Sequence, residues 1–247
     1  MNLKTIRRFF IKPKVSTTVG TLNEITRVTW LEKVLQEIPK GSRILDAGAG
    51  EQQFKKFCKH LDYVSQDFAQ YKPLDLDSGL QMQNWDYGQL DIISDIASIP
   101  EKDNSFDAIM CTEVFEHIIN PRETFTELSR LLKKDGYLIL TAPFCSLTHF
   151  APFHYYTGFS KFFYEKELER TGFELIEMKS NGNYFEYLAQ EINRLESVAK
   201  TYSGVDFKRN DRKNIYQITN TLQNLSDIDT NSSELLCFGF QVLAKKK

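Results

Sequence analysis

The chain has few cysteines, no excess charge of either sign and no apolar run long enough to span a membrane. Its four cysteines, Cys58, Cys111, Cys145 and Cys237, are scattered without Cys-x-x-Cys spacing. This spacing argues against a disulfide framework or a zinc motif and favours a reduced, cytoplasmic protein. The 31 basic and 33 acidic residues leave a net charge of −2, so no overall field attracts nucleic acid. We expect no stable membrane insertion either.

The third glycine of a dinucleotide-binding fingerprint is also missing. Arg43-Ile44-Leu45 indicates a short buried strand, and Asp46-Ala47-Gly48-Ala49-Gly50 indicates the turn that follows it. Two alternating glycines let the backbone approach a ligand closely. The Gly-x-Gly-x-x-Gly pattern, however, needs a glycine where this chain has Gln53. The turn therefore favours a nucleotide-type cofactor that has no pyrophosphate to bind.

Acidic residues follow four predicted strands in succession. The strands are 43–45, 61–66, 90–96 and 106–111, and the acids at or near their ends are Asp46, Asp67, Asp95 and Glu113. Parallel strands bring their carboxyl ends to one edge of the sheet, where ligands bind. Asp67 follows the glycine turn by about twenty residues, at a position where a carboxylate can accept hydrogen bonds from ribose hydroxyls. Taken singly, each acid is equally compatible with a helix cap or a solvated turn.

The order of these motifs resembles that of class I S-adenosylmethionine-dependent methyltransferases, of the small-molecule, type 11-like kind. Asp46-Ala47-Gly48-Ala49-Gly50 resembles the first family motif, and the stretches 105–117 and 131–140 resemble later ones. The resemblance covers about residues 27–182 and 234–245, and it departs from the pattern at the third small position, Gln52. It implies S-adenosylmethionine as the cofactor, with Asp95 near the adenine. The implied cofactor-binding residues are Asp46, Gly48, Gly50, Asp67, Asp95, Ile96 and Glu113.

The same resemblance implies the fold and the division of the chain. It implies an α/β, Rossmann-like sheet of seven mostly parallel strands, with helices on both faces and an antiparallel last strand. Local signals predict helices at 53–60, 120–136 and 160–170, and later strands at 137–141, 173–178 and 234–244. Three parts are expected: a basic arm at 1–26, a methyltransferase domain at 27–182 and 234–247, and a helical insertion at 183–233. The arm holds no apolar run long enough for a signal peptide.

The insertion shows two apolar stripes that repeat every three or four residues. They run from Phe185 to Ala199 and from Ile215 to Leu225, which predicts two amphipathic helices joined by residues 203–214. Helices of this length are marginal alone, so their apolar faces must be covered. Either the pair walls the acceptor pocket, or a second subunit covers it in a homodimer.

The segment from Pro143 to Tyr156 follows the fifth predicted strand and should select the methyl acceptor. It contains two histidines among aromatic residues, His149 and His154. An alcohol acceptor is protonated at neutral pH, so a base must take its proton as the methyl bond forms. His149 and His154 are therefore the candidate catalytic residues. The alternative is that they bond backbone carbonyls and only shape the loop.

A second group, Glu113, Glu116 and His117, has helical spacing if a helix begins by Glu113. Carboxylates and an imidazole on one face could hold a divalent ion, with His149 as a fourth ligand. The pattern resembles the metal ligands of some quinone and RNA-terminal O-methyltransferases, but in metal-free relatives the histidine is a packing residue. We assign no metal from the sequence alone.

The sequence thus predicts methyl transfer from S-adenosylmethionine to a small-molecule acceptor, at a hydroxyl oxygen of a sugar or a secondary-metabolite precursor. The alternative is a catalytically degenerate member of the same fold that binds the cofactor and serves as a partner protein. Acids at all four strand ends argue against degeneracy. Nicotinamide-dependent reduction is disfavoured by Gln53.

Overall fold

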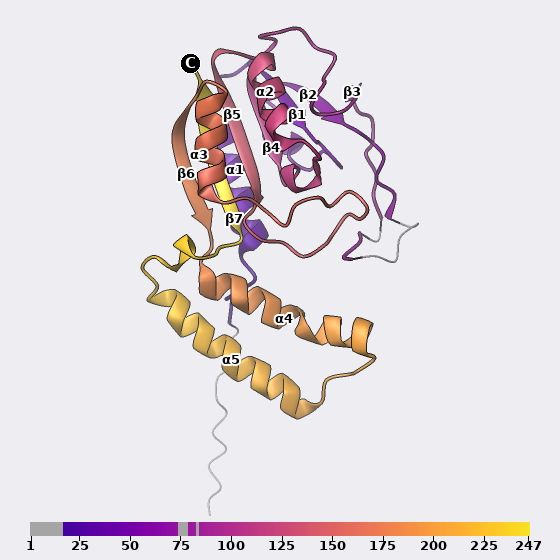
Figure 1. Cartoon of the computed structure of the whole chain (residues 1–247), viewed down its shortest axis with the longest axis vertical. Helices are drawn as coiled ribbons and strands as arrows, with labels where there is room; N and C mark the ends of the chain where they lie inside the picture. The colour runs from indigo at the N-terminus through magenta and orange to yellow at the C-terminus, as the bar shows by residue number, and fades with distance from the viewer. Residues whose placement is uncertain (1–16, 74–78, 83) are drawn as a thin grey trace, which may run out of the picture.

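Seven strands form one sheet in the order β3-β2-β1-β4-β5-β7-β6 (Figure 1). The strands are β1 (Arg43–Ala47), β2 (Asp62–Asp67), β3 (Ile92–Ile93), β4 (Phe106–Thr112), β5 (Leu132–Pro143), β6 (Phe173–Asn181) and β7 (Gly239–Lys246). β7 lies between β5 and β6 and runs antiparallel to both, whereas the other pairs are parallel. The computed structural model describes residues 17–73, 79–82 and 84–247. The predicted Rossmann-like sheet with its antiparallel last strand is confirmed.

Helices cover both faces of this sheet (Figure 1). On one face, α2 (Pro121–Leu131) and α3 (Lys161–Arg170) contribute Phe125, Leu128 and Tyr164 to the larger core cluster. On the other face, α1 (Asn23–Glu37) buries Leu31 and Leu35 against the strands. Strands buried on both faces need apolar residues at successive positions, and this explains the short apolar runs in β1 and β4.

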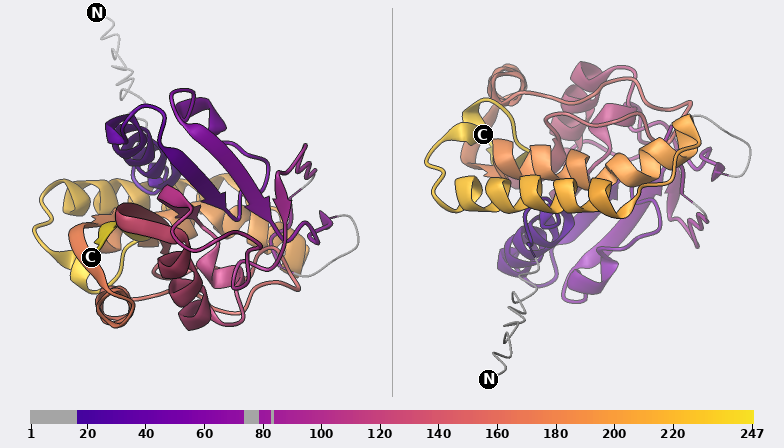
Figure 2. Two further views of the ribbon diagram at one scale, coloured as in Figure 1. Left: turned by 90° about the horizontal axis from the view of Figure 1, so that it is seen from above. Right: turned by 90° about the horizontal axis from the view of Figure 1, so that it is seen from below.

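Two long helices form a pair next to the sheet: α4 (Tyr184–Ser203) and α5 (Arg209–Asp227). They run side by side (Figure 2). Both helices were predicted, but the connection between them, residues 204–208, is shorter than expected. Gly204 adopts the left-handed conformation that ends α4, and the Asp211 carboxylate accepts the Lys208 N–H at the start of α5. Because α4 follows the end of β6 directly, the pair lies at the carboxyl edge of the parallel strands.

Two predicted helices have different bounds. The helix expected at 53–60 is wrong: only the 3₁₀ turn η1 (Lys55–Phe57) forms, after Gln52 takes a positive φ of 57°. The helix that starts at Pro121 ends at Leu131 rather than at Gly136. The next residues enter β5, where Leu132 pairs with Phe106 across a bulge. At both places strand pairing or a turn overrides local helix propensity.

The third strand and the last strand are shorter than predicted. β3 contains two residues, because the carboxylate of Asp91 accepts hydrogen bonds from the backbone N–H and the hydroxyl of Ser65 and so replaces the strand ladder there. β7 begins at Gly239 rather than at 234, after the 3₁₀ turn η4 (Ser232–Glu234).

The N-terminal boundary also differs. α1 begins at Asn23, inside the predicted arm, and Val19 is fully buried against α4 and α5. The basic residues 1–14 of that arm lie outside the described residues. Within the part of the chain that the structure describes, no helix is long and apolar enough to cross a membrane.

Candidate functional site

The glycine turn after β1 has the backbone conformation that only glycine adopts readily. Gly48 has a φ of +78° and Gly50 a φ of +50°. The Gly48 N–H donates to the carbonyl of Gln66 at 2.9 Å. A Cβ on Gly48 would lie 2.5 Å from a methyl carbon of Val114. The turn is thus held close to β2 on one side and to the end of β4 on the other.

Asp67 connects this turn to the end of β2. One carboxylate oxygen accepts the Gly50 N–H at 2.9 Å, and the other accepts the Ala69 N–H at 2.9 Å. A carboxylate offers about four lone-pair positions, so about two remain for a ligand. Burial raises the pKa of Asp67 above its usual value, although backbone N–H bonds oppose the shift. The site fits a ligand that donates two hydroxyl hydrogen bonds, such as a ribose.

Asp46 is buried and already has a partner. Its carboxylate accepts the Tyr63 hydroxyl at 2.6 Å, and its exposed fraction is 2%. Burial raises the pKa of Asp46 to about 7, the Tyr63 bond lowers it, and the charge of Asp67 raises it further. Asp46 therefore joins β1 to β2 beneath the turn, close enough to Asp67 for the two charges to interact.

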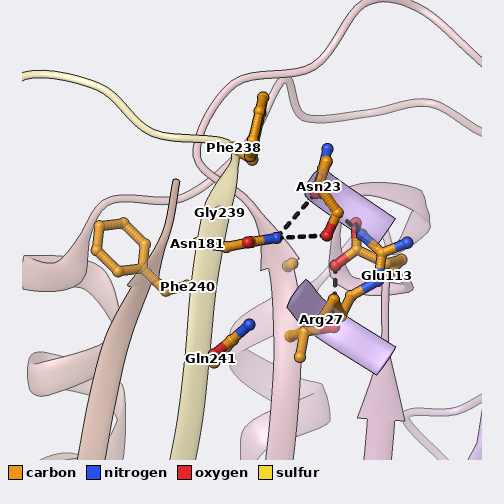
Figure 3. A pocket seen from close by; sticks show the side chains of 10 residues that line it. Asn23, Arg27, Glu113, Asn181, Phe238, Gly239, Phe240 and Gln241 are labelled. Carbon is orange, nitrogen blue, oxygen red and sulfur yellow. Dashed lines mark hydrogen bonds and ion pairs between the residues drawn. The ribbon is translucent and has the colours of Figure 1, made fainter. Parts of the chain in front are cut away.

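The two remaining acids lie apart from this pair. Asp95 is exposed and accepts the Ala97 N–H at 2.8 Å, whereas Ile96 beside it is buried. Glu113 forms an ion pair with Arg27 of α1 at 3.1 Å and accepts the Thr141 hydroxyl at 2.9 Å. It lines a small cavity between α1 and β7 (Figure 3). Of the four predicted acids, the structure brings Asp46 and Asp67 together and turns Glu113 toward α1.

An aromatic group covers the glycine turn, and the sequence did not predict it. It consists of Tyr71, Trp85, Tyr87 and Phe150, whose ring centroids lie 4.3 to 5.9 Å apart in successive pairs. A Cβ on Gly50 would lie 2.9 Å from the Trp85 indole. The side-chain amide of Gln52 donates to the Tyr87 and Gln89 carbonyls at 2.9 and 2.8 Å. Gln52, the residue that departs from the family pattern, thus links the segment that carries Trp85 and Tyr87 to the glycine turn.

Three histidines meet on the loops that follow β4 and β5. One ring nitrogen from each of His117, His149 and His154 lies within 4.8 Å of the other two. Glu116, with an exposed fraction of 1%, places one carboxylate oxygen 3.7 Å from Nε2 of His117 and 3.7 Å from Nε2 of His149. We call these four residues the histidine cluster.

Backbone carbonyls fix two of these rings. Nδ1 of His117 lies 2.7 Å from the Phe153 oxygen, and Nδ1 of His149 lies 2.8 Å from the Leu147 oxygen. A carbonyl only accepts, so Nδ1 carries the hydrogen in both rings, and in the neutral rings Nε2 keeps its lone pair.

Burial sets the charge states within the cluster. Burial together with the charge of His149 lowers the pKa of His117 to about 3, and burial lowers the pKa of His154. Burial also lowers the pKa of His149, but Glu116, the Leu147 carbonyl and the charge of Glu113 together outweigh it, and the net shift is upward. His117 and His154 are therefore neutral at pH 7, and His149 is the ring closest to carrying charge.

The predicted second constellation forms only in part. Glu113 does not begin a helix: it has a φ of +53°, and a 3₁₀ turn, η3 (Phe115–His117), follows it. The helical spacing that would have placed Glu113 beside Glu116 and His117 is therefore wrong. His149 joins them as expected, and His154 takes the place that was expected for Glu113.

Three contacts place the histidine cluster beside the glycine turn. Phe68, next to Asp67, packs edge-on against Phe153 at 4.9 Å. Val114 contacts Gly48 from the start of the turn that carries Glu116. Phe150, next to His149, packs at 4.9 Å against Trp85, which lies over Gly50. The histidines thus stand at the same sheet edge as Asp67.

Comparisons with known proteins show the family and the fold of the chain. The family model described as a methyltransferase domain matches residues 24–178. An uncharacterized protein of Methanocaldococcus jannaschii is 29% identical over 150 residues, which are 60% of this chain and 61% of that protein. The chain thus spans about three fifths of the length of this curated relative.

Solved structures share the fold at low sequence identity. A SAM-dependent methyltransferase from Archaeoglobus fulgidus matches with a TM-score of 0.54 at 18% identity, covering 91% of this chain and 94% of that one. A cyclopropane synthase from Mycobacterium tuberculosis matches with a TM-score of 0.51 at 14% identity, covering 90% of this chain and 84% of that one. The second structure shows that this fold also carries chemistry other than simple methylation, so the site has to indicate the reaction.

Proposed function

Because the chain belongs to the family of methyltransferase domains and carries the fold of S-adenosylmethionine-dependent methyltransferases, we propose that it methylates a hydroxyl oxygen of a small-molecule acceptor. Asp67 and the Gly48–Gly50 turn would hold the cofactor, Asp67 through the ribose hydroxyls and the glycines through close backbone approach. Asp46, which accepts the Tyr63 hydroxyl, would hold β1 and β2 together next to the turn. When bound, S-adenosylmethionine supplies a methyl group on a sulfonium, and its transfer breaks a carbon–sulfur bond and forms an oxygen–carbon bond.

The observation that carries the proposal is the position of the histidine cluster next to Asp67. A hydroxyl acceptor must lose its proton as the methyl bond forms. His149 and His154 come from the loop after β5 and are linked to the Asp67 corner through the Phe68–Phe153 contact. Ring nitrogens with free lone pairs at that edge can accept the proton.

The surroundings support a small acceptor. Tyr187 of α4 lies close enough to Cys145, at the start of the loop that carries His149 and His154, for the two side chains to interact. On the other side, Phe150 packs against Tyr71 and Trp85. Aromatic and helical walls around a few polar groups are typical of small-molecule sites. A sugar or a secondary-metabolite precursor, whose hydroxyls lie on a compact body, is the acceptor class that we propose.

The test separates cofactor binding from chemistry. His149→Ala and His154→Ala should each lower turnover with a hydroxyl acceptor by about 10² to 10⁴, while the affinity for S-adenosylhomocysteine stays unchanged in isothermal titration. His60→Ala is the matched control, because His60 lies at the Ile38 carbonyl, outside the cluster. Full turnover in both cluster variants would contradict the assigned role.

A further inference from the structure

The histidine cluster has the composition and the geometry of a metal site. We propose that Glu116, His117, His149 and His154 bind one divalent first-row transition cation of the Zn²⁺ or Co²⁺ type. Three imidazoles and one carboxylate suit such ions better than Mg²⁺ or Ca²⁺, which prefer oxygen ligands throughout. This set differs from the one that helical spacing suggested, because Glu113 is paired with Arg27 and His154 is present instead.

The distances are those of ligands around a shared ion. Two atoms that each lie about 2.1 Å from one ion can be at most about 4.2 Å apart. The Glu116 oxygen lies 3.7 Å from Nε2 of both His117 and His149, which is too long for a hydrogen bond and within this limit. One nitrogen from each of the three rings lies within 4.8 Å of the others, so the widest pair must approach by up to about 1.4 Å to reach the spacing of about 3.4 Å in a tetrahedral site.

Polar atoms in the cluster are left without partners. The second carboxylate oxygen of Glu116 is shielded from solvent and has no hydrogen-bond partner among the described residues. Both ring nitrogens of His154 are also shielded from solvent, and neither has a hydrogen-bond partner in residues 17–73, 79–82 and 84–247. A buried carboxylate without a partner costs free energy. A divalent cation between these groups would satisfy the unpaired atoms and balance the charge of Glu116.

The rings are already oriented for a metal. Ligating histidines usually donate their other N–H to a carbonyl or carboxylate, which fixes the tautomer. The Phe153 and Leu147 carbonyls do this at Nδ1 of His117 and His149. The backbone supports the cluster further, because the Glu116 carbonyl accepts the N–H groups of Tyr155 and Tyr156 at 2.9 and 3.1 Å. Both loops that supply ligands are thus held together by bonds outside the metal site.

The cation would act on the acceptor in place of a histidine base, with His149 and His154 as its ligands, and this role rests on the proposed methyl transfer. A hydroxyl oxygen bound next to a divalent cation has a lowered pKa, so it gives up its proton to solvent more readily before it takes the methyl group. The binding of the ion itself does not depend on methyl transfer. The two claims can therefore fail separately.

The test uses tag-free full-length protein, stripped with a chelator and titrated with Co²⁺ in visible absorption and with Zn²⁺ in calorimetry. We expect one ion per chain. His117→Ala, His149→Ala and Glu116→Gln should each lower the affinity more than about 100-fold, since even residues outside the ligand set cost about 10- to 100-fold. His60→Ala should bind the ion like the wild type.

Titration of the same variants with S-adenosylhomocysteine shows whether they are folded and whether the proposed function fails on its own. Ion binding without cofactor binding would overturn the proposed function and keep the metal site. Cofactor binding with no ion bound by the wild type, or full turnover in chelator, would overturn the metal site and leave His149 or His154 as a direct base. Equal ion affinity in the wild type and in the ligand variants would also overturn it.

Discussion

Asp67 has two tasks that a single carboxylate can combine. It orders the turn through the Gly50 N–H and, in our account, receives the ribose hydroxyls with its remaining lone pairs. The sequence predicted the second task from the position of the acid at the end of a strand. It could not predict the first, because the Ala69 and Gly50 bonds depend on the path of the chain after β2.

Replacing Asp67 by alanine should therefore cost cofactor affinity. We expect a loss of about 2 to 4 kcal/mol, because ribose donors lose charged partners and the turn loses its anchor. Calorimetric titration with S-adenosylhomocysteine measures it. Asp62→Ala is the control, since Asp62 begins the same strand and is exposed. Equal affinities of the two variants would remove Asp67 from the cofactor site.

The raised pKa of Asp46 predicts that the stability of the folded chain depends on pH. Its pKa in the folded protein is about 7, and the usual value is 3.8. Between these values the folded chain holds a proton that the unfolded chain releases, so this contribution to stability is complete below about pH 4 and is lost as the pH rises through 7. Tyr63, Asp67, Cys58 and Cys111 are the titratable groups whose interaction with Asp46 shifts a pKa.

Urea unfolding of the ligand-free wild type and of Asp46→Asn at pH 5 and pH 8 tests this. The wild type should lose stability relative to the variant between pH 5 and pH 8, by at most about 3 kcal/mol. The neighbouring groups are the same in both proteins and largely cancel. A constant difference between the two proteins would mean that Asp46 is not held protonated by the fold.

At the scale of elements, periodicity predicted the long helices well and the short connections poorly. The stripes in 185–199 and 215–225 lie in α4 and α5. The expected helix at 53–60 and the expected helical start at Glu113 failed, because positive φ values at Gln52 and Glu113 are set by packing of loops against neighbouring strands. The meeting of His154 with His117 likewise depends on the fold of a loop, which no spacing rule describes.

The helical pair should matter for the acceptor and not for the cofactor. Val19, Ala189 and Leu222 form its small core, and the Gly20 N–H donates to Glu186 at 2.6 Å. Replacing residues 184–230 by a short turn should abolish acceptor use and leave S-adenosylhomocysteine binding intact, because Asp67 and the glycine turn are held by β1 and β2. Leu222→Ala perturbs the same helical pair without deleting it, and we expect it to cost about 2 to 5 kcal/mol in stability.

Light scattering and an activity assay decide between the two explanations of the pair. A full-length monomer that loses turnover on deletion supports the pocket wall. A full-length dimer that becomes a folded, active monomer would show that the pair is a dimer arm and that the pocket-wall interpretation is wrong.

At the scale of the whole molecule, the order of motifs along the chain carried most of the prediction. Successive acids at strand ends, together with the glycine turn, indicated parallel strands that end at one edge, and the family resemblance implied the antiparallel last strand that is observed. This worked because each β-α unit places the next strand end at the same edge. The identity of the acceptor could not be predicted in this way. The residues proposed to surround the acceptor come from loops and from the insertion, whose contacts are specific to this chain and follow no motif order.

The most direct test of the account is transfer of an isotope-labelled methyl group. The purified chain, with and without Zn²⁺, would be incubated with methyl-labelled S-adenosylmethionine and a panel of sugars and hydroxylated metabolites, and the products read by mass spectrometry. The account predicts one labelled methyl group on a hydroxyl oxygen, formed together with S-adenosylhomocysteine and lost in Asp67→Ala. Tight cofactor binding with no labelled product from any acceptor class would contradict it and favour a degenerate, cofactor-binding partner protein.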